Sequence, residues 1–191
     1  MSLPAIILCG GESKRMGSPK ALLPFRDGTF LSVLAEILKP FCSPVIAVFG
    51  ADGDRLATLA PAGVTTVVNR NYKAGMLTSL QTGLREVESS RVLFTLVDHP
   101  SPLATTLRAL IASAAPIAIP RMNGRRGHPV IVGPGIAAEI LAEAATAKVR
   151  DVIDRHAASI EYIEVNDPGI SDDVDDPALY NALLAREADR R

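Results

Sequence analysis

Short apolar runs alternate with amphipathic segments through the first two thirds of this 191-residue chain. The apolar runs, each as long as one buried strand, are Pro4–Cys9, Pro44–Phe49, Thr65–Val68, Val92–Val97 and Ile117–Ile119. Between them, apolar residues recur with a helical period in Thr29–Lys39, Asp52–Leu59, Leu77–Glu86 and Leu103–Ser113. Continuously apolar strands that alternate with helices are typical of a parallel sheet covered on both faces. We therefore predict an α/β fold, a Rossmann-like three-layer sandwich with a mostly parallel sheet, whose ligands bind at the carboxyl ends of the strands.

The last third of the chain departs from this rhythm. We expect a polar loop at Arg121–Gly127, followed by an apolar run at Pro129–Val132. Two helical segments come next, at Ile136–Ala145 and Val149–His156. A strand at Ile160–Val165 then leads through a long acidic loop to a last helix at Pro177–Arg186. No composition shift or linker separates this part from the rest. We therefore interpret residues 1–191 as a single domain in which 121–191 elaborate the fold begun by 1–120.

Composition and charge exclude several classes of protein. Apolar residues make up 48% and charged residues 21%, which excludes wholesale disorder. The net charge of −1 argues against a nucleic-acid or anionic membrane surface as the partner. The first apolar run is too short to span a membrane and has no basic segment before it, so we expect a cytoplasmic protein. Cys9 and Cys42 have no metal-ligand spacing and are expected to be free thiols.

The stretch that follows the first apolar run carries the strongest functional signal. It reads LCGGESKRMGSPK from Leu8 to Lys20. Glycines at the end of a strand let backbone amides approach a ligand closely, and Arg15 and Lys20 add positive charge. The spacing fits neither the Walker loop nor the dinucleotide fingerprint. The residues favour a polyphosphate-binding loop, and an ordinary turn with solvated charges is the alternative.

This stretch resembles the signature L-[AC]-[AG]-G-x-S-x-R-M-G-x-x-K of the molybdenum-cofactor nucleotidylyltransferases, the MobA/MocA-like group within the nucleotide-diphospho-sugar transferase fold. The resemblance implies that residues 1–120 bind a nucleotide and that 121–191 form the acceptor side. It also implies a catalytic role for Lys20 at the α-phosphate, a phosphate-clamping role for Arg15, and contacts with the nucleotide from Leu8, Cys9, Gly10 and Gly11.

Further motifs follow in the order of that family. Asn69 and Ser79 fall in segments similar to those that cover the nucleotide, although Ser79 could instead be a plain helix cap. Asp98, at the end of an apolar run, matches the family's metal-binding aspartate, with a helix cap as the alternative reading. The next residue, His99, stands where the cytidylyl branch often has glutamine.

The acceptor side carries two more matching segments. Arg126 and His128 lie in a stretch that resembles the family's G-H-P-V segment and implies contacts with a phosphorylated acceptor; a structural histidine is the alternative. Asp175, with Asp173 as second choice, matches the aspartate that completes the metal site in related transferases. A solvated acidic cap is the alternative there, and Asp176 replaces the usual threonine.

The resemblance implies transfer of a nucleoside monophosphate from an NTP to molybdopterin or the molybdenum cofactor, with release of pyrophosphate. Mg²⁺ would be held by Asp98 and Asp175, and a molybdoenzyme is a possible recipient of the product. We expect CTP on the number of matching motifs, whereas Gly10 leaves room for the purine of GTP. A sugar- or polyol-phosphate nucleotidyltransferase is one alternative, and a non-catalytic cofactor-binding maturation protein is the other.

Overall fold

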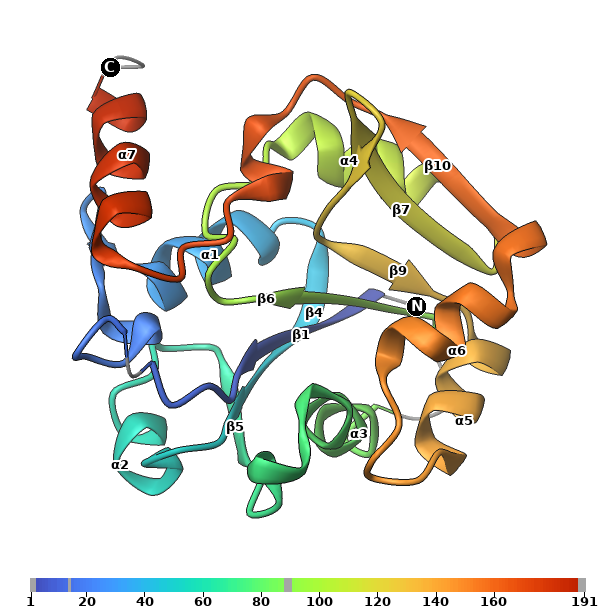
Figure 1. Cartoon of the computed structure of the whole chain (residues 1–191), viewed down its shortest axis with the longest axis horizontal. Coiled ribbons are helices and arrows are strands. Elements are labelled where there is room, and N and C mark those ends of the chain that lie inside the picture. Colours follow the sequence, from blue (N-terminus) through green and yellow to red (C-terminus); the bar gives the residue numbers. More distant parts are fainter. Residues whose placement is uncertain (1–2, 14, 88–90, 189–191) are drawn as a thin grey trace.

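A mixed eight-stranded sheet runs through the middle of the molecule (Figure 1). The computed structural model describes residues 3–13, 15–87 and 91–188. Seven of the strands follow the order β10 (Ile160–Glu164), β7 (Ile117–Met122), β9 (Val130–Val132), β6 (Val92–Leu96), β1 (Leu3–Cys9), β4 (Cys42–Phe49) and β5 (Thr65–Val68). The eighth strand, β8 (Arg125–Arg126), lies outside this order and pairs with β7. Neighbours within the order pair in parallel except for β9, which runs antiparallel to both β6 and β7. The predicted α/β sandwich with a mostly parallel sheet is confirmed.

Helices cover both faces of the sheet, which gives three layers (Figure 1). One layer contains α1 (Phe30–Leu38), α4 (Ala104–Ala112) and α7 (Pro177–Ala188). The opposite layer contains α3 (Met76–Leu84), α5 (Pro134–Ala142) and α6 (Val149–Arg155). A short helix, α2 (Gly53–Ala57), packs against β4 and β5.

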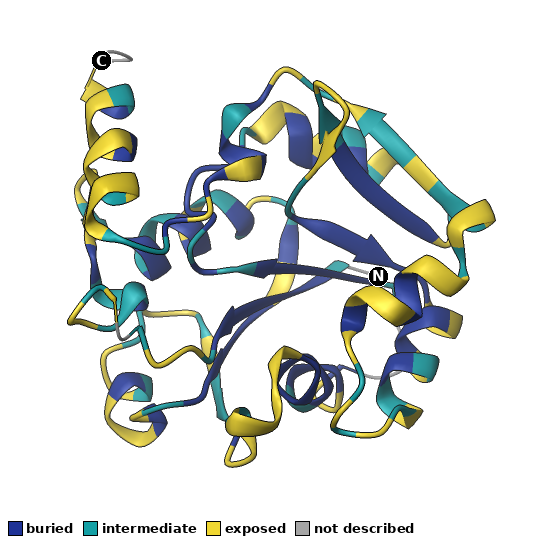
Figure 2. Ribbon diagram, in the orientation of Figure 1, coloured by how far each residue is buried: buried dark blue, intermediate teal, exposed yellow. Residues whose placement is uncertain are grey.

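The side chains of β1 show why such a strand reads as a continuous apolar run. Ala5, Ile7 and Cys9 belong to the core cluster on one face, and Ile6 and Leu8 belong to the cluster on the other. Successive side chains of a strand point to opposite faces, so a strand covered on both sides has no polar face. Figure 2 shows these central strands buried and the outward faces of the helices exposed.

The start of α1 is fixed by a reciprocal cap. The Thr29 hydroxyl accepts a hydrogen bond from the Ser32 backbone amide at 3.3 Å, and the Ser32 hydroxyl accepts one from the Thr29 amide at 2.7 Å. Such a capping box satisfies amides that the first turn of a helix leaves without partners. The cap lies at the end of a small hairpin of β2 (Pro24–Phe25) and β3 (Gly28–Thr29). Each of these strands is two residues long, which is too short to show an apolar pattern in the sequence.

The expectation of a polar loop at Arg121–Gly127 is wrong. Residues Arg121 and Met122 continue β7, and the chain reverses through Asn123 and Gly124 to form β8 (Arg125–Arg126), which pairs back with β7. Both turn residues have positive φ, 51° for Asn123 and 76° for Gly124. Asparagine followed by glycine is the favoured pair for such a tight hairpin turn, so the signal was present in the sequence.

The C-terminal segment returns across the sheet toward the loop that follows β1. Strand β10 pairs with β7, and the 3₁₀ turn Pro168–Ser171 leads into α7 (Figure 1). The Tyr180 hydroxyl of α7 donates a hydrogen bond to the Pro24 carbonyl at 2.6 Å, and Arg26 pairs with Glu187 at 2.7 Å. These contacts hold the acidic segment 172–176 beside the glycine-rich loop. Among the described residues, no helix is both long and apolar enough to cross a membrane.

Candidate functional site

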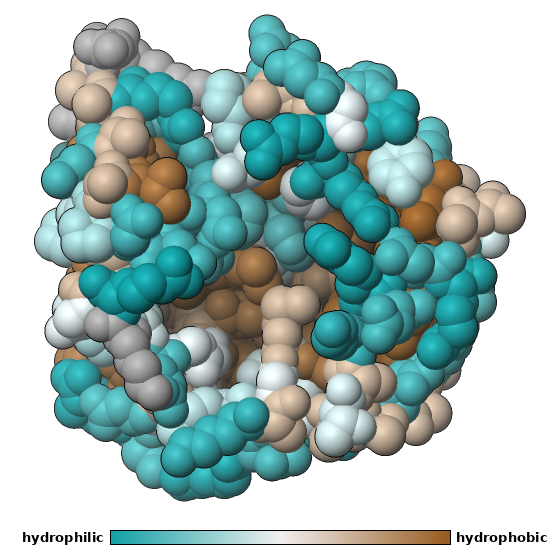
Figure 3. All heavy atoms as spheres, in the orientation of Figure 1, coloured by the Kyte–Doolittle hydropathy of each residue, from teal (hydrophilic) through white to brown (hydrophobic). Residues whose placement is uncertain are grey.

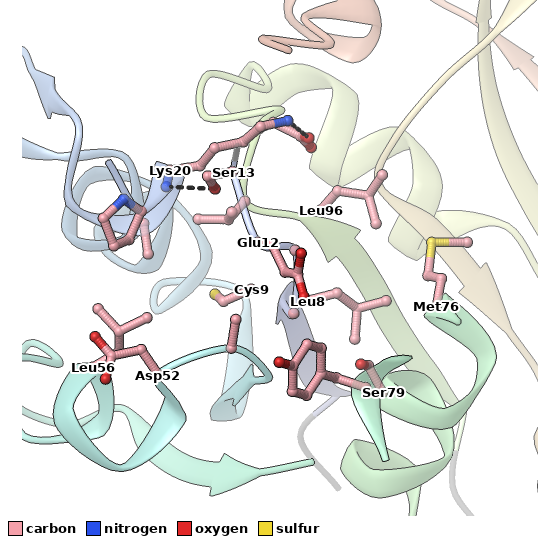
Figure 4. A pocket seen from close by; sticks show the side chains of 18 of the residues that line it. Leu8, Cys9, Glu12, Ser13, Lys20, Asp52, Leu56, Met76, Ser79 and Leu96 are labelled. Carbon is pink, nitrogen blue, oxygen red and sulfur yellow. Dashed lines mark hydrogen bonds and ion pairs between the residues drawn. The ribbon is translucent and has the colours of Figure 1, made fainter. Parts of the chain in front are cut away.

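A cleft of about 530 Å³ opens at the carboxyl ends of β1 and β6. Its floor is apolar, with Leu8, Leu96 and Val97 among the lining residues, and polar residues gather around its mouth (Figure 3). In Figure 4, Lys20 lies at one end of the cleft, Asp52 and Leu56 are on one side, and Met76 and Ser79 of α3 are on the other. The cleft therefore lies where parallel strands of an open α/β sheet end, which is where ligands of such folds bind.

Lys20 and Asp98 meet at one end of this cleft. The Lys20 Nζ atom donates a hydrogen bond to Asp98 Oδ2 at 2.7 Å, and both side chains are about 15% exposed (14% for Lys20 and 15% for Asp98). Burial lowers the pKa of Lys20, but the charge of Asp98 and hydrogen bonds to Asp175 and Asp98 outweigh it, so the pKa is raised overall. The ammonium group is therefore charged at neutral pH.

Asp175 joins the two basic residues of the glycine-rich loop. Its Oδ1 atom accepts a hydrogen bond from Lys20 Nζ at 2.5 Å, and its Oδ2 atom accepts one from Arg15 Nη2 at 2.6 Å. The hydrogen bond from Lys20 is the main reason that the pKa of Asp175 is lowered, and Arg15 adds to the effect. A carboxylate thus occupies the position between the two cations, and the same two cations could pair with a phosphate anion.

Asp98, His99 and Asp173 form a cluster of possible metal ligands. One ligand atom from each lies within 4.8 Å of the other two, and His99 Nε2 is 4.0 Å from Asp98 Oδ1. Among the described residues, the buried Asp98 Oδ1 atom has no hydrogen-bond partner. Asp173 is exposed, yet partial desolvation of its carboxyl and the neighbouring charges of Asp98 and Asp175 raise its pKa, which marks a surplus of negative charge. An unsatisfied carboxylate oxygen in such a cluster fits a divalent cation.

Most of the residues predicted to contact a nucleotide line the cleft; these are Leu8, Cys9, Gly10, Gly11 and Ser79. Asn69 does not line the cleft, but it contacts a residue that does. The Asn69 side chain donates hydrogen bonds to Thr78 Oγ1 at 2.9 Å and to Ser79 Oγ at 3.0 Å. Helix α3 begins after Gly75, so Ser79 lies within the helix and does not cap it. Asn69 therefore orients the hydroxyl that Ser79 presents to the cleft.

Two glycines allow the loops around the cleft to pack closely. A Cβ atom on Gly10 would lie 2.8 Å from Ser79 Oγ, and one on Gly50 would lie 2.5 Å from the Gly10 carbonyl oxygen. Both distances are too short for a side chain without movement of a neighbour. Gly50 follows β4, and its role has no signal in the sequence, because an isolated glycine after a strand resembles any turn.

The Cys9 thiol lies at the floor of the cleft and is unreactive. Burial, followed by the charge of Asp98, raises its pKa far above the ordinary value for cysteine. Its Sγ atom contacts the Ile7 carbonyl oxygen at 3.8 Å. A thiol that does not ionise is a poor nucleophile, so Cys9 acts as a small apolar residue here.

Arg126 and His128 lie outside the residues that line the cleft. Arg126 is exposed on β8 and pairs with Asp154 at 2.9 Å. The His128 ring packs against the rings of Phe94 and His99, with centroid distances of 5.9 and 4.9 Å. Burial, and then the proximity of His99, lower the pKa of His128 to about 3, so the ring is neutral at pH 7. The structure thus connects His128 to the metal-ligand cluster through His99, whereas Arg126 is separate from it.

Asp176, in the acidic segment 172–176, has a structural role at the start of α7. Its Oδ1 atom accepts hydrogen bonds from the amides of Ala178 and Leu179, each at 2.9 Å, at the start of α7. The capping interpretation therefore holds for Asp176. The same interpretation is wrong for Asp98. The next helix, α4, begins after Leu103, so Asp98 does not cap it.

Comparisons with known proteins add the family context. The family model described as the MobA-like NTP transferase domain matches residues 5–160. The chain is 30% identical over 196 residues to nicotine blue oxidoreductase of Paenarthrobacter nicotinovorans, covering 94% of this chain and 95% of that protein. It is 28% identical over 170 residues to molybdenum cofactor cytidylyltransferase of Escherichia coli K12, covering 86% and 88%.

A solved structure supports the fold assignment. A nucleotidyl transferase from Methanothermobacter thermautotroptrophicus superposes with a TM-score of 0.84 at 17% identity, over 100% of this chain and 99% of that chain. The fold is thus that of nucleotidyltransferases. The two sequence relatives carry names from different reaction classes, so an activity has to be argued from the residues in the cleft.

Proposed function

Because this chain belongs to the MobA-like NTP transferase family, we propose that it transfers a nucleoside monophosphate from an NTP to a phosphorylated acceptor and releases pyrophosphate. The observation that carries this proposal is the contact between Lys20 and Asp98 at one end of the cleft. A buried cation beside a carboxylate, at the end of a glycine-rich loop, supplies a place for both a phosphate and a divalent cation.

In the proposed reaction an acceptor phosphate oxygen attacks the α-phosphorus of the NTP as the bond to the pyrophosphate oxygen breaks. Lys20 stabilises the negative charge on the α-phosphate, and Arg15 holds the departing pyrophosphate. The acceptor phosphate is already ionised near neutral pH, so no general base is required. In the structure, Asp175 pairs with Lys20 and Arg15. We therefore infer that nucleotide phosphates replace Asp175 as the partner of one or both cations.

We assign the divalent cation to the acidic residues beside Lys20. Asp98 is the first ligand, and Asp173 and Asp175 are the candidates for the second. Two observations support Asp173 as the second ligand. The Asp98 Oδ1 atom has no hydrogen-bond partner among the described residues, and a carboxylate oxygen of Asp173 lies within 4.8 Å of a ligand atom of Asp98. Mg²⁺ is the proposed ion because it is bound by one or two carboxylates together with substrate phosphates, and it supplies neutralisation of phosphate charge.

CTP is the proposed nucleotide and molybdopterin the proposed acceptor. Similarity to a molybdenum cofactor cytidylyltransferase over most of both chains supports this choice. GTP is the alternative nucleotide. Gly10 has no side chain beside Ser79, and this leaves room in the cleft for the larger purine base of GTP. A sugar phosphate is the alternative acceptor, and we place acceptor contacts near His99 and His128.

Pyrophosphate release by the full chain tests the proposal. Each of CTP, GTP, ATP and UTP is offered with Mg²⁺ and either molybdopterin or glucose 1-phosphate, and each nucleotide without an acceptor is the control. We expect acceptor-dependent release that is fastest with CTP and molybdopterin. The absence of release in every combination would overturn the transferase assignment and would leave the oxidoreductase relative as the better guide. Release that depends on glucose 1-phosphate alone would overturn the acceptor assignment.

A further inference from the structure

The cluster at the end of β6 contains a nitrogen ligand as well as oxygen ligands. His99 is 6% exposed, and its Nε2 atom faces Asp98 Oδ1 at 4.0 Å. Among the described residues, His99 Nδ1 and Asp98 Oδ1 are both buried without a hydrogen-bond partner. Buried polar atoms nearly always have partners, so the orphaned Asp98 Oδ1 atom, which faces His99 Nε2, points to a ligand that binds between these two atoms.

We propose that Asp98, His99 and Asp173 form a mixed oxygen and nitrogen site that selects a first-row divalent transition metal over Mg²⁺. Mg²⁺ strongly prefers oxygen ligands and water, whereas imidazole binds the transition metals well. Mn²⁺ accepts both carboxylate and imidazole ligands, which makes it the test ion. This inference rests on the proposed function, because the same site would hold the cation of the transfer reaction, and it replaces Mg²⁺ by a transition metal as the preferred ion there. Its test does not require turnover.

The orientation of the His99 ring is set by its surroundings. The ring packs against His128 at a centroid distance of 4.9 Å, and His128 in turn packs edge to face on Phe94 at 5.9 Å. The His128 backbone amide donates a hydrogen bond to the Ile170 carbonyl at 2.9 Å, which ties this ring to the segment that leads to Asp173. Packing of this kind holds a ligand ring in one orientation and lowers the cost of metal binding.

Charge around the cluster also favours a cation. Asp98, Asp173 and Asp175 lie together, and the lysine and arginine side chains that pair with them in the described part of the chain are Lys20 and Arg15. Lys20 binds Asp98 through Oδ2, so Oδ1 is left to face His99. The metal site and the lysine can therefore use different oxygens of the same carboxylate.

The cluster must contract to bind an ion. Ligand atoms at right angles around an ion, each with a bond of about 2.1 Å, lie roughly 3 Å apart. The ligand atoms here lie up to 4.8 Å apart. Asp173 is exposed and belongs to a segment without regular secondary structure, so it is the ligand that can move. We expect Asp173 to close on Asp98 and His99 when the metal binds.

Electron paramagnetic resonance of Mn²⁺ added to the full chain tests the site directly. Pulsed measurements detect the nuclear spin of a nitrogen bonded to Mn²⁺, and we expect this nitrogen signal in the wild type. Because His99 is buried, this measurement on the unmodified protein stands even if a variant fails to fold. Mn²⁺ bound without nitrogen coupling, or no bound Mn²⁺, would overturn the proposal.

Affinities of variants complete the test. Loss of the free Mn²⁺ signal gives the Kd for Mn²⁺, and competition gives the Kd for Mg²⁺. We expect wild type to bind Mn²⁺ at least about tenfold more tightly than Mg²⁺, and H99Q to lose at least about fivefold in Mn²⁺ affinity with Mg²⁺ affinity changed less than twofold. H156Q is the matched control, because His156 pairs with Glu139 on α5. Equal Mn²⁺ affinities of H99Q and H156Q would contradict the assignment.

The outcomes separate this inference from the proposed function. Nitrogen-coupled Mn²⁺ in a chain that releases no pyrophosphate would overturn the transferase proposal and leave the metal site standing. Pyrophosphate release by a chain in which Mn²⁺ shows no nitrogen coupling would overturn the metal site and leave the transferase proposal standing.

Discussion

The Nζ atom of Lys20 lies 2.7 Å from Oδ2 of Asp98, although the two residues are 78 positions apart in the chain. The contact exists because β1 and β6 are parallel neighbours, with Leu8 opposite Leu96, so the segments that follow them leave the sheet at the same edge. A pair of opposite charges at this edge, on the rim of the cleft, is consistent with a site in which both residues act on one polyphosphate.

Removal of either charge should slow the proposed reaction. We expect K20M and D98N each to lower the rate of pyrophosphate release at least about tenfold, which corresponds to about 1.4 kcal/mol of transition-state stabilisation. K148M is the matched control for the lysine, because Lys148 is exposed and does not line the cleft. Thermal unfolding of each variant shows whether the fold is kept. Rates within twofold of wild type in both K20M and D98N would contradict the assigned roles.

Gly10 should tolerate a side chain only if Ser79 makes room for it. A Cβ atom at position 10 would meet Ser79 Oγ at 2.8 Å. Overpacking of this kind typically costs about 1–3 kcal/mol, so we expect G10A to lower the free energy of unfolding by that amount. The variant S79A lacks the obstructing oxygen. We therefore expect G10A to lower the free energy of unfolding much less when it is added to S79A than when it is added to wild type. Equal effects of G10A in the two backgrounds would show that Ser79 is not the obstacle.

The strands and helices could be predicted because burial is recorded in the spacing of apolar residues. The predicted run Val92–Val97 corresponds to β6 at Val92–Leu96, and the predicted helix Leu103–Ser113 corresponds to α4 at Ala104–Ala112. The direction of a strand leaves no such record. The apolar run Pro129–Val132 was recognised, but nothing in it indicates that β9 runs antiparallel to its neighbours.

The residues of the site could be predicted in part, for a different reason. Lys20 and Asp98 follow neighbouring parallel strands, so the sheet brings them together whatever the loops do. Asp173, Asp175 and Arg126 lie in segments whose paths depend on packing far from the sheet edge. The structure places Asp175 on Lys20, Asp173 near His99, and Arg126 on Asp154. Local sequence cannot specify such pairings, because they form only after the C-terminal segment has folded back.

The core formed by α1 should respond strongly to truncation. Leu34 is 0% exposed and packs in the cluster between α1 and the sheet. We expect L34A to lower the free energy of unfolding by about 2–5 kcal/mol, because the cavity that it leaves can collapse only partly. L59A is the control at an exposed leucine, which is 51% exposed, and its effect should stay within about 0.5 kcal/mol. Denaturant unfolding followed by circular dichroism measures both values.

Acid should destabilise the protein partly through His128. Burial, and then the proximity of His99, lower the pKa of this residue to about 3 in the folded state, against an ordinary value of 6.5. Between these two values the unfolded chain binds a proton at this position and the folded chain does not. Stability from the neutral ring is therefore complete above about pH 6.5 and is lost progressively as the pH falls toward 3, with a slope of up to about 1.4 kcal/mol per pH unit.

The substitution H128Q removes this titration while it keeps a polar side chain of similar length. The difference in unfolding free energy between wild type and H128Q at pH 8 gives the cost of the substitution itself, since the histidine is almost entirely neutral in both states there. Only the change in that difference at lower pH reports the proton. We expect the difference to shrink by at least about 1 kcal/mol between pH 6 and pH 4.5. A difference that stays constant over this range would mean that the His128 ring becomes protonated in the folded protein as readily as in the unfolded chain. The ring would then have to be open to water, which conflicts with a Nδ1 atom buried without a partner among the described residues.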